Sequence, residues 1–162
     1  MVKVSIDLTE LIKENQVEYL SQYYANSPKS HAEFSLILRN FYHDGNWQEF
    51  GYNHEDDKHG YSGVIPSCFW LIALSDLNRT IKADEENVCH KTANALLSKF
   101  KMGSIQKTIF NHNDVLNTSL LAAFALKCYS QTFLNEGSYK AKIIETYARR
   151  AVYRALLTQL RN

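Results

Sequence analysis

Two stretches of this chain are apolar around nearly the whole circumference of a helix, and each is followed by a stretch that is apolar on one side only. The apolar stretches are expected at about 63–79 and from 113 or 114 onward, and the amphipathic ones at 84–103 and from 139 to about 160. A helix that is apolar all round must be enclosed by its neighbours, whereas an amphipathic helix keeps one face in water. The alternation predicts inner helices covered by outer helices, as stacked helical hairpins require.

Two further helices are predicted nearer the N-terminus. One covers about 7–24, and the next opens at Ser27-Pro28 with Ser27 as its cap, because proline is favoured at the first helical position. A chain of 162 residues fits one domain. The predicted fold class is therefore all-α, with three stacked antiparallel helical hairpins in a single domain over 1–162. Such a stack is either open, as in helical-repeat proteins, or one part of a closed ring of hairpins.

Charge and hydropathy exclude two classes of partner. The chain has 18 Lys and Arg against 17 Asp and Glu, a net charge of +1, so no electrostatic footprint for nucleic acid is expected. The longest strongly apolar runs, Cys68–Leu74 and Leu120–Leu126, are much shorter than the ~20 residues that span a bilayer. The start of the chain lacks the apolar region of a signal peptide. Three cysteines within helical patterns indicate reduced thiols, and a cytoplasmic location is expected.

Two loops carry the densest polar and aromatic patterns. The long segment 43–62 and the segment 110–114 each contain an aromatic-Asn-His triplet that precedes an apolar helix, so both loops should emerge at one end of the stack. Histidine titrates near neutrality, and carboxylates can hold a metal or tune a site. The catalytic candidates are His54, His59, His112 and Asp57, and the ligand-binding candidates are Trp47, Tyr52, Tyr61 and Asp114. A solvated loop and core aromatic rings are the alternative interpretation.

The segment Asp44-Gly45-Asn46-Trp47, after a helix that ends in Phe41-Tyr42, resembles the Gly-x-Trp signature of cyclase repeats. Two-layered hairpins with this turn are similar to the α/α-toroid families, which include terpene cyclases, glycan epimerases and lyases, and lanthionine synthetase cyclases. His59-Gly60-Tyr61-Ser62-Gly63 also fits the His-Gly-x-x-Gly motif of the lanthionine cyclases. Cys89-His90-Lys91 departs from their zinc-binding Cys-His-Gly at its last position.

The resemblance implies a carbohydrate-active or related toroid enzyme, or part of one, acting on a sugar-like or anionic ligand at the 47–62 and 110–114 loops. A non-catalytic helical-repeat protein-interaction module is the alternative, and a lanthionine-cyclase-like zinc protein is the second. The sequence does not decide whether the chain is an enzyme, and either no cofactor or a divalent metal is expected. The expected partner is a sugar-like small molecule or a protein. Self-association as a homo-oligomer, or a missing covalent neighbour, is also expected, with four tyrosines as candidate contacts: Tyr23, Tyr24, Tyr147 and Tyr153.

Overall fold

The protein is helical throughout most of the part that the computed structural model describes, which is residues 23–43, 46–47, 64–77, 79–101, 104–105 and 112–161. The elements in chain order are α2 (His31–Phe41), β1 (Tyr42–His43), β2 (Asn46–Trp47), α3 (Val64–Ser75), α4 (Ala83–Lys99), β3 (Phe100–Lys101), β4 (Ser104–Ile105), α5 (His112–Phe133) and α6 (Tyr139–Arg161). Within the described ranges the strands form only two short antiparallel pairs. The all-α prediction is confirmed for these residues.

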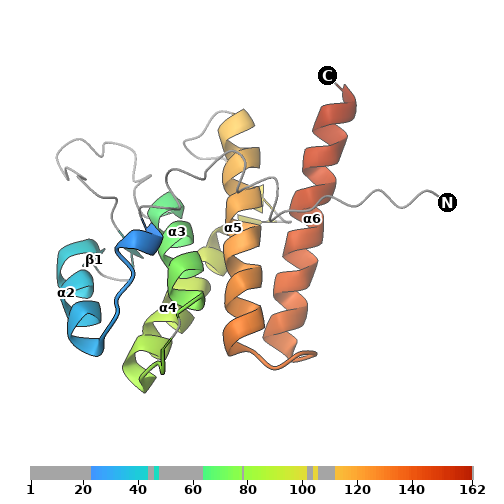
Figure 1. Cartoon of the computed structure of the whole chain (residues 1–162). Helices are drawn as coiled ribbons and strands as arrows, with labels where there is room; N and C mark the ends of the chain where they lie inside the picture. The colour runs from blue at the N-terminus through green and yellow to red at the C-terminus, as the bar shows by residue number, and fades with distance from the viewer. Residues whose placement is uncertain are drawn as a thin grey trace.

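Helices α3 and α5 lie side by side at the centre of the molecule, with α4 packed on α3 and α6 packed on α5 (Figure 1). Every residue of α3 except Ile65 is buried, as expected for a segment that is apolar on all sides. The four side chains that the pattern places in the core, Phe69, Leu74, Leu120 and Phe124, are between 1% and 8% exposed. Among the described helices, none has both the length and the apolarity needed to cross a bilayer.

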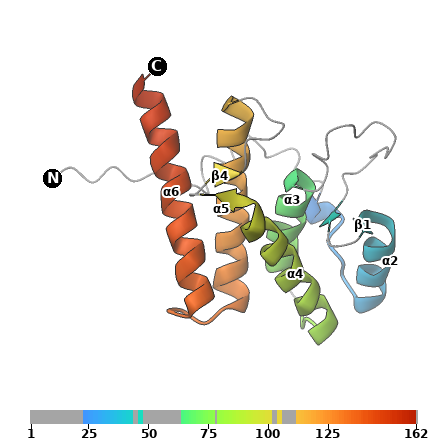
Figure 2. The same cartoon turned by 180° about the vertical axis from the view of Figure 1, so that it is seen from behind.

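The helices alternate in direction. In the view of Figure 1, α3 and α5 both begin at the upper end and run downward, whereas α2, α4 and α6 begin at the lower end and run upward. The same alternation is visible from behind in Figure 2. The first residues of the two inner helices, Val64 and His112, therefore lie toward the same end of the molecule.

Helix α2 begins later than the sequence predicts. Its cap is Ser30, whose Oγ accepts a hydrogen bond from the backbone N–H of Glu33 at 3.2 Å. The predicted cap, Ser27, instead uses its hydroxyl to donate to the backbone oxygen of Tyr23 at 3.1 Å, which closes the preceding turn. The Glu33 carboxylate also accepts from the backbone N–H of Lys29 at 2.7 Å. The Ser-x-x-Glu spacing therefore starts the helix three residues after the Ser27-Pro28 pair.

Each of the two outer helices α2 and α4 ends in the same way. An aromatic residue, Tyr42 or Phe100, takes an extended conformation at the C-cap and starts a two-residue strand. The first ladder pairs Tyr42 with Trp47, and the second pairs Phe100 with Ile105. Helix α4 consequently ends at Lys99, four residues before the expected end at position 103. The sequence α2–β1–β2–α3 is thus followed by a second unit of the same order, α4–β3–β4–α5.

Candidate functional site

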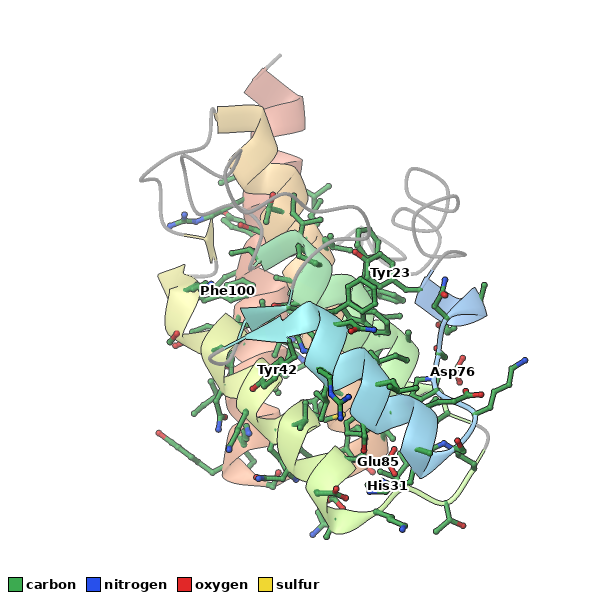
Figure 3. All side chains as sticks on the ribbon, turned by 90° about the vertical axis from the view of Figure 1, so that its left-hand side faces the viewer. Tyr23, His31, Tyr42, Asp76, Glu85 and Phe100 are labelled. Atoms are coloured by element: carbon green, nitrogen blue, oxygen red, sulfur yellow. The ribbon has the colours of Figure 1, made fainter. Side chains whose placement is uncertain are left out.

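Two clusters of titratable side chains lie at the lower end of the described structure, where α2, α4 and α6 begin. The first cluster, called the Glu85 cluster, contains His31, Arg79, Asp84 and Glu85. Figure 3 shows His31 and Glu85 next to each other at this end. The second, called the Tyr129 cluster, contains Glu86, His90, Tyr129 and Lys140. Both clusters lie at the end opposite to the first residues of α3 and α5 (Figure 1).

Glu85 is the centre of the first cluster, and its side chain is only 1% exposed. The Arg79 guanidinium binds both carboxylate oxygens, with Nη1 donating to Oε1 at 3.0 Å and Nη2 donating to Oε2. The backbone N–H of Lys82 donates to Oε1 at 3.3 Å. Burial alone would raise the pKa of Glu85, but the hydrogen bonds from Arg79, His31 and Lys82 and the charge of Arg79 lower it below its ordinary value. Glu85 is therefore an ionised, fully hydrogen-bonded buried carboxylate.

His31 connects the first turn of α2 to the first turn of α4. Its Nδ1 lies 3.2 Å from Glu85 Oε1, and its Nε2 lies 3.3 Å from Asp84 Oδ2. One potential ligand atom from each of these three side chains lies within 4.8 Å of the others, which is a spacing that a metal ion could use. Arg79, however, already neutralises Glu85, and a metal ion would have to displace that guanidinium. The donor set fits a structural tie better than a metal centre.

The Tyr129 cluster joins three helices through one buried phenol. Lys140, the second residue of α6, donates from Nζ to the Tyr129 hydroxyl at 2.8 Å. The same hydroxyl is hydrogen-bonded to Nδ1 of His90 on α4, and His90 Nε2 lies 3.2 Å from Glu86 Oε1, one turn earlier on that helix. The four groups form a continuous chain from α6 through α5 to α4.

The burial of Tyr129 and its two hydrogen bonds indicate the direction of the hydrogen bonds along this chain. Burial, reinforced by Cys89 and Glu86, raises the pKa of Tyr129 to about 12, so its hydroxyl keeps its proton at neutral pH. The neutral phenol of Tyr129 accepts a hydrogen bond from Lys140 and therefore donates its own proton to His90 Nδ1. The imidazole proton is then on Nε2, which donates to the Glu86 carboxylate. Burial lowers the pKa of Lys140. With this tautomer of His90, the hydrogen bonds of the chain share one direction, from Lys140 toward Glu86.

Local helix geometry places these side chains. Glu86 and His90 are four residues apart on α4 and therefore share a face. Tyr129 and Phe133 are also four residues apart, on α5, and both rings meet the His90 ring edge to face, with centroids at 5.5 and 6.1 Å. The Tyr129 side chain is fully buried, whereas 34% of His90 and 46% of Glu86 is exposed. The chain thus leads from the interior to the surface.

The structure describes the side chain of one of the eight predicted site residues. Five of them, His54, Asp57, His59, Tyr52 and Tyr61, lie outside the described residues. His112 is the first residue of α5 and Asp114 is in its first turn, but their side chains also lie outside the description.

Trp47 is the one predicted site residue whose side chain is described, and it lies in the core. Its ring is 0% exposed and stacks on Trp70 with centroids 5.0 Å apart. Its Nε1 donates to the Thr92 hydroxyl at 2.9 Å. The alternative interpretation of a core aromatic ring fits these contacts, and a ligand-binding role for Trp47 stays a prediction.

The predicted contact tyrosines divide into two kinds. Tyr23 is buried and stacks on Phe69 with centroids 5.1 Å apart, and Tyr147 stacks on Phe100 with centroids 5.6 Å apart. Tyr24 and Tyr153 are exposed. A contact surface built on Tyr23 is therefore wrong, because its ring fills the core beside α3.

Sequence reasoning missed the Tyr129 cluster. Tyr129 and His90 are 39 residues apart, so no local spacing connects them. The sequence pattern that points to this cluster is the four-residue spacing of Glu86 and His90 on one helix face. This spacing is also common on solvated helices and is therefore not specific. The motif comparison instead groups His90 with Cys89, in a segment that departs from the zinc motif at its last position. Burial raises the pKa of the Cys89 thiol to about 12, and both nitrogens of His90 lie within hydrogen-bond distance of other groups. A zinc site at this pair stays a prediction.

Comparisons with known proteins give no relative from which a function could be transferred. No protein-family model, curated protein or solved structure matches this chain. The function has to be argued from the site and the fold alone.

Proposed function

We propose that this chain is an α/α-hairpin domain of the toroid kind that binds a sugar-like or anionic small molecule at the end where α3 and α5 begin. The observation that carries the proposal is the common direction of these two inner helices, whose first residues, Val64 and His112, lie toward the same end (Figure 1). His112 is itself the first residue of α5, and the segment that carries His54 precedes α3 in the sequence. Unpaired backbone N–H groups at a helix start favour an anionic or hydroxyl-rich ligand.

The repeated unit supports the two-layer part of the proposal. An outer helix, an aromatic C-cap, a two-residue ladder and an inner helix occur twice in the same order. In each unit the outer helix ends, and the inner helix begins, toward the proposed ligand end (Figure 1). Repeats of this kind add pairs of helices to a curved stack, and their loops accumulate on one face.

Ligand binding can be tested by calorimetric titration with a panel of neutral sugars, amino sugars and uronic acids. Binding by at least one class is expected, and His54→Ala and His112→Ala should each weaken it. His90→Gln is the matched control, because His90 belongs to the Tyr129 cluster, where it contacts Tyr129 and Glu86. The proposal is overturned if no member of the panel binds, or if binding is weakened only by the control substitution.

The second candidate function, a protein-interaction module, is favoured by the outer face of α6. Tyr139 and Tyr153 on this helix are 81% and 63% exposed. The helix carries six basic residues and one acidic residue, whereas the whole chain has a net charge of only +1. Exposed tyrosine and arginine side chains are typical of protein interfaces. Self-association would be one form of this function, and sedimentation of the Tyr139→Ser and Tyr153→Ser double variant against wild type tests it.

A further inference from the structure

Lys140 differs from the three Lys and Arg side chains that form ion pairs among the described residues, because its partner is neutral. Arg79 is paired with Glu85, and Lys127 and Arg149 are both paired with Glu145. Among the described residues, no carboxylate lies within ion-pairing distance of Lys140 Nζ. Its hydrogen-bond partner is the neutral phenol of Tyr129 at 2.8 Å, and its Nζ lies 5.0 Å from the centre of that ring.

Three features of this position disfavour the charged form of the amine. The side chain is partly buried, and burial lowers the pKa of Lys140. Lys140 lies in the first turn of α6, where the partial positive charge of the helix end repels a cation. Its partner Tyr129 is uncharged at neutral pH. A desolvated lysine near positive charge is the arrangement that makes an amine nucleophilic.

We propose that Lys140 is a nucleophilic amine that forms an imine with a small aldehyde, assisted by the proton relay through Tyr129, His90 and Glu86. This site is separate from the proposed ligand end, because the Tyr129 cluster lies where α6 begins and the other site lies where α3 and α5 begin. Failure of either proposal therefore leaves the other standing.

The relay supplies each proton that imine formation needs. The ammonium of Lys140 gives a proton to the Tyr129 oxygen, Tyr129 gives its own proton to His90 Nδ1, and His90 gives its Nε2 proton to Glu86. The free amine then attacks the carbonyl carbon and forms a carbinolamine. Return of the proton along the same chain to the carbinolamine hydroxyl releases water and leaves a protonated imine. One carbonyl oxygen leaves as water, and no oxidant or reductant is required.

A purely structural role would also explain a lysine over a tyrosine ring, since an ammonium is attracted to an aromatic face. The two roles predict different chemistry. A structural ammonium is protected from aldehydes, whereas a nucleophilic amine reacts faster than the exposed lysines of the same protein. Lys142, two residues further along α6 and exposed, is the matched internal control.

The test is reductive trapping of the full chain with glycolaldehyde and sodium cyanoborohydride near neutral pH, followed by peptide mass spectrometry. Alkylation of Lys140 is expected to be roughly tenfold faster than that of Lys142, a modest share of what positioned acid–base groups contribute. The rate at Lys140 should also reach its plateau at a lower pH than the rate at Lys142. A wild-type rate at Lys140 that does not exceed the rate at Lys142 overturns the proposal, whatever the variants do.

The relay is tested separately with His90→Gln, which keeps a hydrogen-bonding group beside Tyr129. Alkylation of Lys140 should slow roughly tenfold, while alkylation of Lys142 should not change. Lys142→Arg should leave the Lys140 rate at the wild-type value. Equal rates at Lys140 in wild type and His90→Gln would overturn the role of the relay, provided that thermal unfolding shows the variant to be folded.

Discussion

The indole N–H of Trp47 donates to the hydroxyl of Thr92 at 2.9 Å, across 45 residues of chain and without contact with water. The Thr92 hydroxyl in turn donates to the backbone oxygen of Val88 at 2.8 Å, and the backbone N–H of Trp47 points to the Ser67 hydroxyl at 3.4 Å. One residue of a two-residue strand thereby contacts both α3 and α4. The hairpin after α2 is fixed to the inner layer by polar contacts as well as by apolar packing.

Thr92→Val tests this contact. Valine has nearly the same shape as threonine but cannot accept the indole proton, so the buried N–H of Trp47 loses its partner. We expect a loss of about 1–3 kcal/mol in the free energy of unfolding, measured by urea denaturation. Thr92→Ser keeps the acceptor and is the control. A loss in the serine variant as large as that in the valine variant would show that the methyl group, and not the hydroxyl, matters.

Glu85→Gln tests the first cluster. The substitution removes the negative charge that Arg79 neutralises while keeping the shape of the side chain. Breaking one partner of a buried pair should lower the free energy of unfolding by about 3 kcal/mol. The control is Asp84→Asn, because Asp84 is exposed and its contact to His31 should contribute less than about 1 kcal/mol. Similar losses in the two variants would contradict the central role of Glu85.

The same carboxylate makes stability depend on pH. The pKa of folded-state Glu85 is below its ordinary value of 4.5, so just below that pH the unfolded chain binds a proton that the folded chain does not. Stability therefore rises with pH through this window and is lost as pH falls through the folded-state pKa. The stability difference between wild type and Glu85→Gln should be constant above about pH 5 and shrink below it. Chemical denaturation over a pH series measures it, and a difference that grows on acidification would contradict the assignment.

Ser30→Ala tests where α2 begins. Loss of the cap hydroxyl should destabilise the protein by about 1 kcal/mol, because the N–H of Glu33 loses its acceptor. Ser27→Ala removes the serine that local pattern favours as the cap and should change stability by less than about 0.5 kcal/mol. Thermal unfolding of the two variants compares them directly. The reverse order of effects would restore Ser27 as the cap.

The inner helices were predictable because their pattern is local. A run such as the one from Cys68 to Leu74 has no polar side that could face water. Its burial can therefore be predicted without knowing which elements pack against it. The start of α2 was not predictable with the same rule. Both Ser27-Pro28 and Ser30 fit the pattern of a helix start. Ser30 is the cap because the Ser27 hydroxyl donates to the backbone oxygen of Tyr23 and closes the preceding turn.

The candidate site was predictable only in part. The aromatic-Asn-His triplets around His54 and His112 are local patterns, so the sequence alone can single them out. Their placement at one end of the molecule stays a prediction. The Tyr129 cluster depends on contacts between three helices. Its members come together because α4, α5 and α6 pack against one another, and spacing within one helix does not encode the angle at which the next helix crosses it.

The stacking of Trp47 on Trp70 has an optical consequence. These are the two tryptophans of the chain, and their rings lie 5.0 Å apart at an interplanar angle of 26°. Tryptophan fluorescence therefore reports on one region of the protein, where the first ladder packs against α3. Fraying of α6 would leave the emission spectrum unchanged, whereas undocking of the ladder would shift it toward the red as water reaches the rings. The transition dipoles of two indole rings at this separation also couple and give a circular-dichroism couplet. Loss of this couplet is a second spectroscopic measure of the undocking of the ladder.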